Sequence, residues 1–285
     1  MNGLRFVFLG LALWGGGVGA APLLLGTTPV VADVVAQVAG PAFLVESLIP
    51  AGVDPHAFEP TPRDLQKLLQ AALIFQNGAG LEAGLAPFLG LPEVRAKVVD
   101  LSAGLPFLEG AEGEPDPHVW WDPTLVARWV ERIRDVLSAR FPQEAQGFAE
   151  RASRYFQELA ALDAWIREAV EGIPPERRLL VTDHLVLGYF ARRYGFRVVG
   201  ALIPSVETLA EPSPQEIAAL EETLRAWNIP AIFVSTPVPS ALALRVARDT
   251  GARLVALPME GPPEGGGYLA MMREAVRRLV EALSP

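Results

Sequence analysis

The chain has 285 residues, of which 51% are hydrophobic and 20% are charged, so it can form one or two packed domains and does not resemble a disordered protein. Its formal net charge of −9 makes nucleic acid an unfavourable partner. It contains no cysteine, which excludes disulfides, thiolate metal sites, cysteine nucleophiles and a lipid attached to cysteine.

The first twenty residues have the composition of a secretory signal peptide. A positive charge at Arg5 precedes an apolar run, and Val18 and Ala20 stand before the expected cleavage site. A transmembrane anchor is the alternative, but three glycines interrupt the run, which is shorter than the roughly 20 residues that a spanning helix needs. We therefore expect residues 1–20 to be removed on export. Because the mature chain has no cysteine for a lipid, we expect it to be periplasmic.

From residue 23 the sequence alternates short β-rich runs with amphipathic helical runs. This alternation is typical of α/β layers built on a mainly parallel sheet. The predicted elements are strands at residues 22–28, 42–50, 72–78 and 97–102, helices at 29–40 and 62–72, and a further helix that begins near residue 122. Residues 21–141 are therefore predicted to form an N-terminal α/β lobe.

A run of more than thirty residues, bounded by prolines, predicts one long helix over residues 142–174. Apolar residues recur at a spacing of three or four, as helical periodicity requires, at Phe148, Ala152, Tyr155, Leu159, Leu162, Trp165 and Ile166. Such a helix would be on the order of 40 Å long, enough to cross a whole lobe. We expect it to be a stiff connection between two lobes.

The alternation returns after this helix and predicts a second lobe over residues 175–285. Its elements are strands at 178–183, 196–202, 231–236 and 253–258 and helices near 185–194, 214–227, 240–250 and 267–283. The predicted fold class is therefore α/β, with two lobes of mainly parallel sheet joined by one long helix.

The chain has only three histidines, and each is predicted at a junction between a loop and a helix. Each also follows an aspartate by one or two positions, in the pairs Asp54 with His56, Asp116 with His118 and Asp183 with His184. Open α/β sheets bind ligands at the carboxyl ends of their strands. A metal-bound imidazole usually donates its other N–H to a carboxylate or carbonyl oxygen, which an aspartate can supply. The alternative is that the aspartates only cap helices and fill turns.

Three imidazoles that meet in a cleft suit a divalent transition metal, above all zinc with its four ligands. Manganese sites contain more carboxylates, so the histidines favour zinc. A carboxylate as fourth ligand would close the site, whereas water would permit hydrolysis. A protein with such a metal site could be a secreted zinc hydrolase, or a scaffold protein in which the metal is structural. The sequence has neither a His-Glu-x-x-His nor a Gly-x-Ser-x-Gly motif, which disfavours the hydrolase.

Five segments carry a resemblance to a known family, at residues 48–82, 116–123, 181–200, 211–220 and 268–283. In this order they resemble motifs of the periplasmic metal-binding proteins that serve zinc and manganese ABC transporters. The resemblance implies two α/β lobes with the metal in the cleft between them. It also implies a binding protein, not an enzyme, that delivers zinc to a membrane permease, with manganese as the alternative cargo. We expect a monomer.

The resemblance further implies which residues hold the metal. It places His56 and His118 as ligands from the N-terminal lobe and His184 as the ligand from the C-terminal lobe. A histidine at this last position is typical of zinc-type members, whereas many manganese-type members have a glutamate there.

The fourth family ligand is usually an aspartate just past the last strand, and this sequence departs from that pattern. It reads VALPMEGPPEGGGY, with Glu260 as the nearest carboxylate. We expect Glu260 to substitute for the aspartate, with water or Glu264 as alternatives. Glu207 stands where the family keeps a polar residue near the cleft, and we expect it to be solvated rather than bonded to a ligand.

Overall fold

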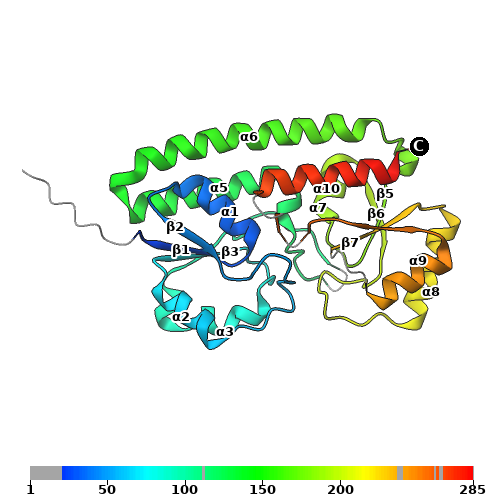
Figure 1. The fold of residues 1–285 in the computed structure, drawn as a ribbon, viewed down its shortest axis with the longest axis horizontal. Coiled ribbons are helices and arrows are strands. Elements are labelled where there is room, and N and C mark those ends of the chain that lie inside the picture. The colour runs from blue at the N-terminus through cyan, green and yellow to red at the C-terminus, as the bar shows by residue number, and fades with distance from the viewer. Residues whose placement is uncertain (1–20, 111–112, 236–239, 260, 263–265, 285) are drawn as a thin grey trace, which may run out of the picture.

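The computed structural model of the protein describes residues 21–110, 113–235, 240–259, 261–262 and 266–284. Within these ranges two α/β lobes lie side by side beneath a long helix (Figure 1), so the predicted fold class is confirmed. The predicted signal peptide lies outside the described residues. The lobe boundaries at residues 141 and 174 stay predictions.

The N-terminal lobe contains a parallel sheet with strand order β2-β1-β3-β4. The strands are β1 (Leu23–Gly26), β2 (Leu44–Ser47), β3 (Leu73–Gln76) and β4 (Val98–Asp100). The helices are α1 (Pro29–Ala39), α2 (Pro62–Gln70), α3 (Ala86–Leu89), α4 (Pro92–Arg95) and α5 (Pro123–Arg140). Helices cover both faces of this sheet, and its central strands are accordingly apolar throughout, as in LLLG of β1.

The C-terminal lobe repeats this arrangement with strand order β6-β5-β7-β8. The strands are β5 (Leu179–Thr182), β6 (Arg197–Ala201), β7 (Ala231–Val234) and β8 (Arg253–Ala256). The helices are α7 (Gly188–Tyr194), α8 (Pro214–Ala226), α9 (Ala241–Thr250) and α10 (Tyr268–Leu283). The strand order reverses between β5 and β7, so the loops that follow these two strands form a crevice of the kind that binds ligands.

The long predicted helix is α6, which spans Ala145–Glu171 and crosses both lobes (Figure 1). It begins later than predicted because Pro142–Glu144 forms a 3-10 turn. Its buried face follows the predicted spacing, except that Trp165 lies at the edge of this face, beneath the guanidinium of Arg273. At 1.5 Å per residue, its 27 residues extend about 40 Å.

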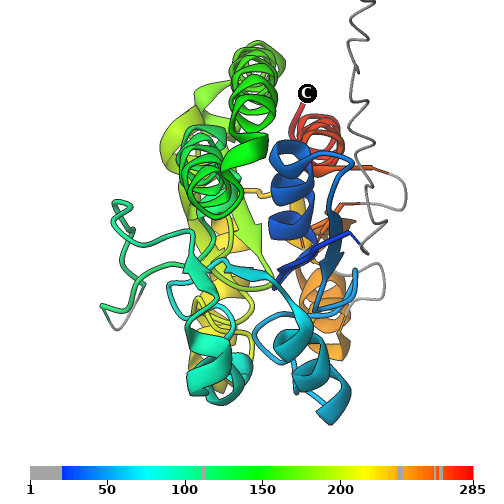
Figure 2. The same cartoon turned by 90° about the vertical axis from the view of Figure 1, so that its left-hand side faces the viewer.

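The helices α1, α5, α6 and α10 form one layer over the two sheets, as the end-on view in Figure 2 shows. An apolar core runs through this layer and joins the lobes; within it, Trp121 and Phe190 pack edge to face with ring centroids 6.4 Å apart. Each lobe also has its own apolar cluster, around Ile74 and around Ile232. These cores can hold the lobes together without help from a bound ion.

The start of α10 is fixed by a residue from the other lobe. The helix has no capping side chain of its own, since Gly267 precedes it. The carboxylate of Asp33 on α1 accepts the Tyr268 N–H at 2.7 Å, and the Tyr268 hydroxyl donates to the Trp120 carbonyl, also at 2.7 Å. A Cβ at position 267 would lie 2.6 Å from Asp33 Oδ1, so this close approach requires glycine.

No helix in the described part of the chain combines the length and apolarity needed to cross a membrane.

Candidate metal centre

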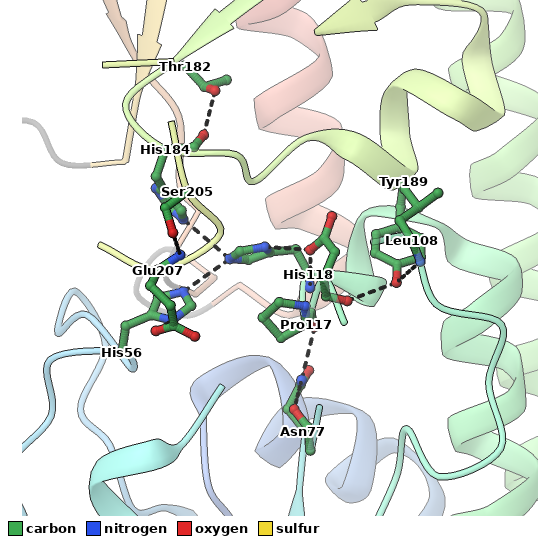
Figure 3. A network of polar contacts seen from close by, with 12 residues as sticks. His56, Asn77, Leu108, Pro117, His118, Thr182, His184, Tyr189, Ser205 and Glu207 are labelled. Carbon is green, nitrogen blue, oxygen red and sulfur yellow. Dashed lines mark hydrogen bonds and ion pairs between the residues drawn. The ribbon is translucent and has the colours of Figure 1, made fainter. Parts of the chain in front are cut away.

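The three histidines meet where the two lobes face each other. The Nε2 atom of His118 lies 3.1 Å from Nε2 of His56 and 3.3 Å from Nε2 of His184. All three residues are buried, and their nearest ring nitrogens lie within 4.8 Å of one another. Figure 3 shows the rings of His56 and His184 directed at the ring of His118. The edge of a tetrahedron around zinc with nitrogen ligands is roughly 3.3 Å, so this spacing fits one ion.

The backbone N–H of each histidine is bound by the aspartate that precedes it. The backbone N–H of His56 donates to Asp54 at 2.9 Å. The equivalent bonds are 2.9 Å from the His118 N–H to Asp116 and 2.8 Å from the His184 N–H to Asp183. The turn role expected of an aspartate is therefore present at Asp54 and Asp116, which bind the N–H two residues on, whereas Asp183 binds the N–H of the next residue.

Two of these aspartates also bind the imidazole ring itself. Asp116 lies 2.7 Å from Nδ1 of His118, and Asp183 lies 2.9 Å from Nδ1 of His184. A carboxylate at Nδ1 fixes the ring with its N–H on that side and leaves Nε2 free to bind a cation. For these two pairs the sequence expectation is confirmed.

The expectation for Asp54 was wrong, and so was that for Glu207. One oxygen of Asp54 accepts the His56 N–H and the other accepts the hydroxyl of Thr208 at 2.6 Å. Nδ1 of His56 instead lies 3.0 Å from Glu207 Oε2. Glu207 belongs to the other lobe and is 151 positions away, so no local spacing in the sequence indicates this pair.

Burial determines where a proton sits when no ion is present. It raises the pKa of Asp116 to about 7, although the His118 N–H opposes this shift. Burial, together with the neighbouring imidazoles, lowers the pKa of His118 well below its ordinary value. Below about pH 7 the Asp116 carboxyl of the metal-free protein therefore stays protonated, while the His118 ring stays neutral, as a metal ligand must be. When Asp116 loses its proton, its carboxylate can accept Nδ1–H and Nε2 is free for a cation.

The other two carboxylates are held in the ionised form. Burial alone would raise the pKa of Asp183, but hydrogen bonds from the His184 ring and from Ser235 lower it below its ordinary value. The hydrogen bond from His56 lowers the pKa of Glu207. Both groups can therefore accept an N–H from a metal-bound imidazole and balance part of the charge of a cation.

The loop of His118 is held from both lobes by residues that the sequence reasoning did not identify. The Asn77 side chain, which follows β3, donates to the Pro117 carbonyl at 3.0 Å. From α7 of the other lobe, the Tyr189 hydroxyl donates to the Asp116 carbonyl at 2.8 Å and accepts the Leu108 N–H at 3.0 Å. Figure 3 shows this chain of contacts running outward from the His118 ring. The loop is thus hydrogen-bonded to both lobes.

The remaining wall of the cavity is largely apolar, with contributions from Val30, Leu81, Trp120, Val186 and Met259. Within the described residues, no carboxylate joins the three imidazoles in the cluster of possible ligands. The expected fourth ligand Glu260 and its alternative Glu264 lie outside the described residues. Met259, directly before Glu260 in the sequence, is buried. The Ser235 hydroxyl donates to its sulfur at 3.4 Å.

Comparison with protein families gives a match over almost the whole chain. Residues 25–282 match the family model ZnuA, described as the periplasmic component A of the zinc-uptake complex. This range includes all three histidines and all of both sheets except the first two residues of β1.

Characterised relatives are named for different metals. The zinc-binding protein TroA of Treponema pallidum is 32% identical over 277 residues, which cover 92% of this chain and 89% of TroA. The manganese ABC transporter substrate-binding lipoprotein PsaA of Streptococcus anginosus is also 32% identical over 277 residues, with the same coverage of 92% and 89%. Sequence similarity alone therefore does not separate zinc from manganese.

Solved structures agree with the fold. The periplasmic zinc-binding protein TroA from Treponema pallidum superposes with a TM-score of 0.85 at 30% identity, covering 93% of this chain and 99% of TroA. A manganese-bound periplasmic metal-binding protein from Candidatus Liberibacter asiaticus gives a TM-score of 0.79 at 24% identity, covering 92% and 99%. The second likeness is evidence for the fold alone.

Proposed function

The chain belongs to the ZnuA family and is a metal-binding, extracytoplasmic substrate-binding protein of an ABC transporter; from this premise we propose that its cargo is zinc. The observation that carries the proposal is the spacing of the imidazoles. Nε2 of His118 lies 3.1 and 3.3 Å from the other two Nε2 atoms, the separation that ligands of one tetrahedral zinc ion require.

The ligand chemistry supports zinc over manganese. Imidazole nitrogen suits zinc, whereas manganese prefers carboxylate, carbonyl and water oxygens. The cavity wall adds mainly apolar side chains to the three imidazoles. Manganese is the second candidate because a relative as similar as PsaA is named for it.

We propose that His56, His118 and His184 bind the ion and that Glu260 completes the coordination. Met259, the residue before Glu260 in the sequence, lines the cavity. A carboxylate there would leave no coordination position for a reactive water, as suits a protein that carries an ion rather than one that uses it.

A secreted zinc hydrolase is disfavoured by the surroundings of the imidazoles. A hydrolase needs a general base beside a metal-bound water. Among the described residues, Asp116, Asp183 and Glu207 already face the Nδ1 atoms, on the opposite side of each ring from the cluster of Nε2 atoms. We propose that the protein is exported with cleavage of residues 1–20, acts in the periplasm as a monomer, and passes its zinc to a membrane permease.

Metal analysis and calorimetry test the proposal directly. Protein purified without added metal should contain zinc, and metal-free protein should bind one zinc ion with higher affinity than manganese at equal ionic strength. Tighter binding of manganese than of zinc would overturn the assignment of cargo. Hydrolysis of ester or peptide substrates by the zinc-loaded protein would overturn the transport function.

A further inference from the structure

The three imidazoles differ in where their carboxylate partners come from. His118 and His184 each bind an aspartate of their own loop. His56 binds Glu207, which lies between β6 and α8 of the opposite lobe. The His56 side chain is 2% exposed, whereas that of Glu207 is 42% exposed. The orientation of His56 therefore depends on a residue at the rim of the other lobe.

A second polar contact lies directly beside this pair. The hydroxyl of Thr208 donates to Asp54 at 2.6 Å, and Asp54 in turn accepts the backbone N–H of His56. Consecutive residues of one lobe thus bind the ring and the turn of the same histidine. Two adjacent hydrogen bonds fix the position of the Glu207 loop relative to His56 better than one bond would.

The loop that carries Glu207 is also tied to the third histidine. The N–H of Leu185, next to His184, donates to the Ser205 carbonyl at 2.8 Å. The Glu207 N–H donates to the Ser205 hydroxyl at 3.0 Å, as Figure 3 shows. The loop that carries Glu207 is therefore hydrogen-bonded beside His184, in its own lobe, as well as to His56 in the other lobe.

Taking zinc as the cargo, as proposed above, we propose that Glu207 is a positioning residue that sets the ring of His56 across the interface between the lobes. Its carboxylate holds the proton on Nδ1 and directs Nε2 at the ion. Because Glu207 and His56 belong to different lobes, the ring is fully oriented only while the lobes are together. Without this acceptor the ring is free to turn, so loss of the contact accelerates release of the ion.

The test compares Glu207→Ala and Glu207→Gln with Glu211→Ala, an exposed glutamate of the same loop. Zinc affinity is measured by competition with a chelating indicator, and zinc release is measured by stopped flow. In Glu207→Ala the affinity should fall by roughly ten- to a hundredfold, the usual effect of losing such a partner, mainly through faster release. In Glu207→Gln the amide oxygen can still accept the Nδ1 proton, so most of the affinity should return. Glu211→Ala should match the unchanged protein.

A spectroscopic measurement separates positioning from a general loss of structure. In zinc-loaded protein labelled with 15N, the Nδ1 proton of His56 should exchange slowly with water, and it should exchange faster in Glu207→Ala while that of His118 is unchanged. Equal affinity, release rate and exchange in Glu207→Ala and the unchanged protein would overturn the proposal, and so would equal losses in the alanine and glutamine variants. Failure of the unchanged protein to bind zinc would instead refute the proposed cargo.

Discussion

Nδ1 of His118 lies 2.7 Å from a carboxylate oxygen of Asp116, and both residues are buried. Burial raises the pKa of Asp116 to about 7 and lowers the pKa of His118 well below 6.5. In the metal-free protein the carboxyl group therefore keeps a proton that the imidazole does not take. A zinc ion can bind Nε2 only when Nδ1 carries the ring proton and the Asp116 carboxylate is ionised. Below about pH 7 the pair must therefore lose one proton when zinc binds.

The first prediction follows from this proton. Below a pH of about 7, zinc binding should release a proton from the Asp116–His118 pair, and affinity should weaken as pH falls; above about pH 8 this release should be absent. Calorimetry at pH 6 and pH 8, in buffers of different ionisation enthalpy, counts the protons released. Asp116→Asn removes the titrating carboxyl and should abolish this part of the release. A zinc affinity that is constant between pH 5 and 7.5 would contradict the prediction.

The same pair predicts how the free energy of unfolding of the metal-free protein depends on pH. A lowered histidine pKa means that stability rises with pH up to 6.5, because only the unfolded chain binds that proton. A raised aspartate pKa means that stability falls as pH rises from 3.8 to about 7, because the folded chain binds the extra proton. In the window from about 4 to 6.5 the two slopes oppose each other. Chemical denaturation across this window should show little pH dependence from this pair, and Asp116→Asn should reveal the histidine slope.

Removal of each imidazole should weaken binding without unfolding the protein. His56→Ala, His118→Ala and His184→Ala should each reduce zinc affinity by at least tenfold, since an imidazole ligand contributes more than its outer partners do. The apolar cores of the lobes do not involve the ion, so circular dichroism and the denaturation midpoint of the metal-free protein should change little. A variant with unchanged affinity would remove that histidine from the ligand set.

The fourth ligand is tested by Glu260→Ala, with Glu264→Ala as its matched control. If Glu260 completes the tetrahedron, its loss should lower zinc affinity while the Glu264 variant keeps it. Zinc would then bind through three imidazoles and water. Cobalt substitution gives a second readout, because its visible spectrum reports the number of ligands. The opposite ranking of the two variants would assign the position to Glu264, and no effect in either would assign it to water.

Asp33 should contribute to stability as the cap of α10. Its carboxylate accepts the Tyr268 N–H at 2.7 Å in place of a capping side chain that the helix lacks. Asp33→Ala should lower the free energy of unfolding by about 1 kcal/mol, and Asp33→Asn by less, as for other helix caps. Urea denaturation measures both, with Asp135→Ala, an exposed aspartate on α5, as the control. A destabilisation no larger than that of the control would remove the capping role.

The layered fold could be predicted from the sequence because periodicity is a local property. Each of the strands β1 to β8 falls within a range that the alternation of residue types predicts. The short helices α3 and α4 were missed because four residues show no helical period. Helix α7 begins at Gly188 rather than near residue 185, since the Val186 N–H donates to the His184 carbonyl in a tight turn that is not helical.

For the candidate metal centre, the sequence by itself identified the three histidines and two of their carboxylate partners. Asp116 and Asp183 stand within two positions of the imidazole they bind, so adjacency along the chain is enough to pair them. Only the tertiary structure decided the partner of His56, because Asp54 binds the His56 backbone N–H and the Thr208 hydroxyl, whereas Glu207 approaches the ring from the other lobe. Such a contact depends on how two separately folded lobes dock, and no spacing in the sequence encodes that distance.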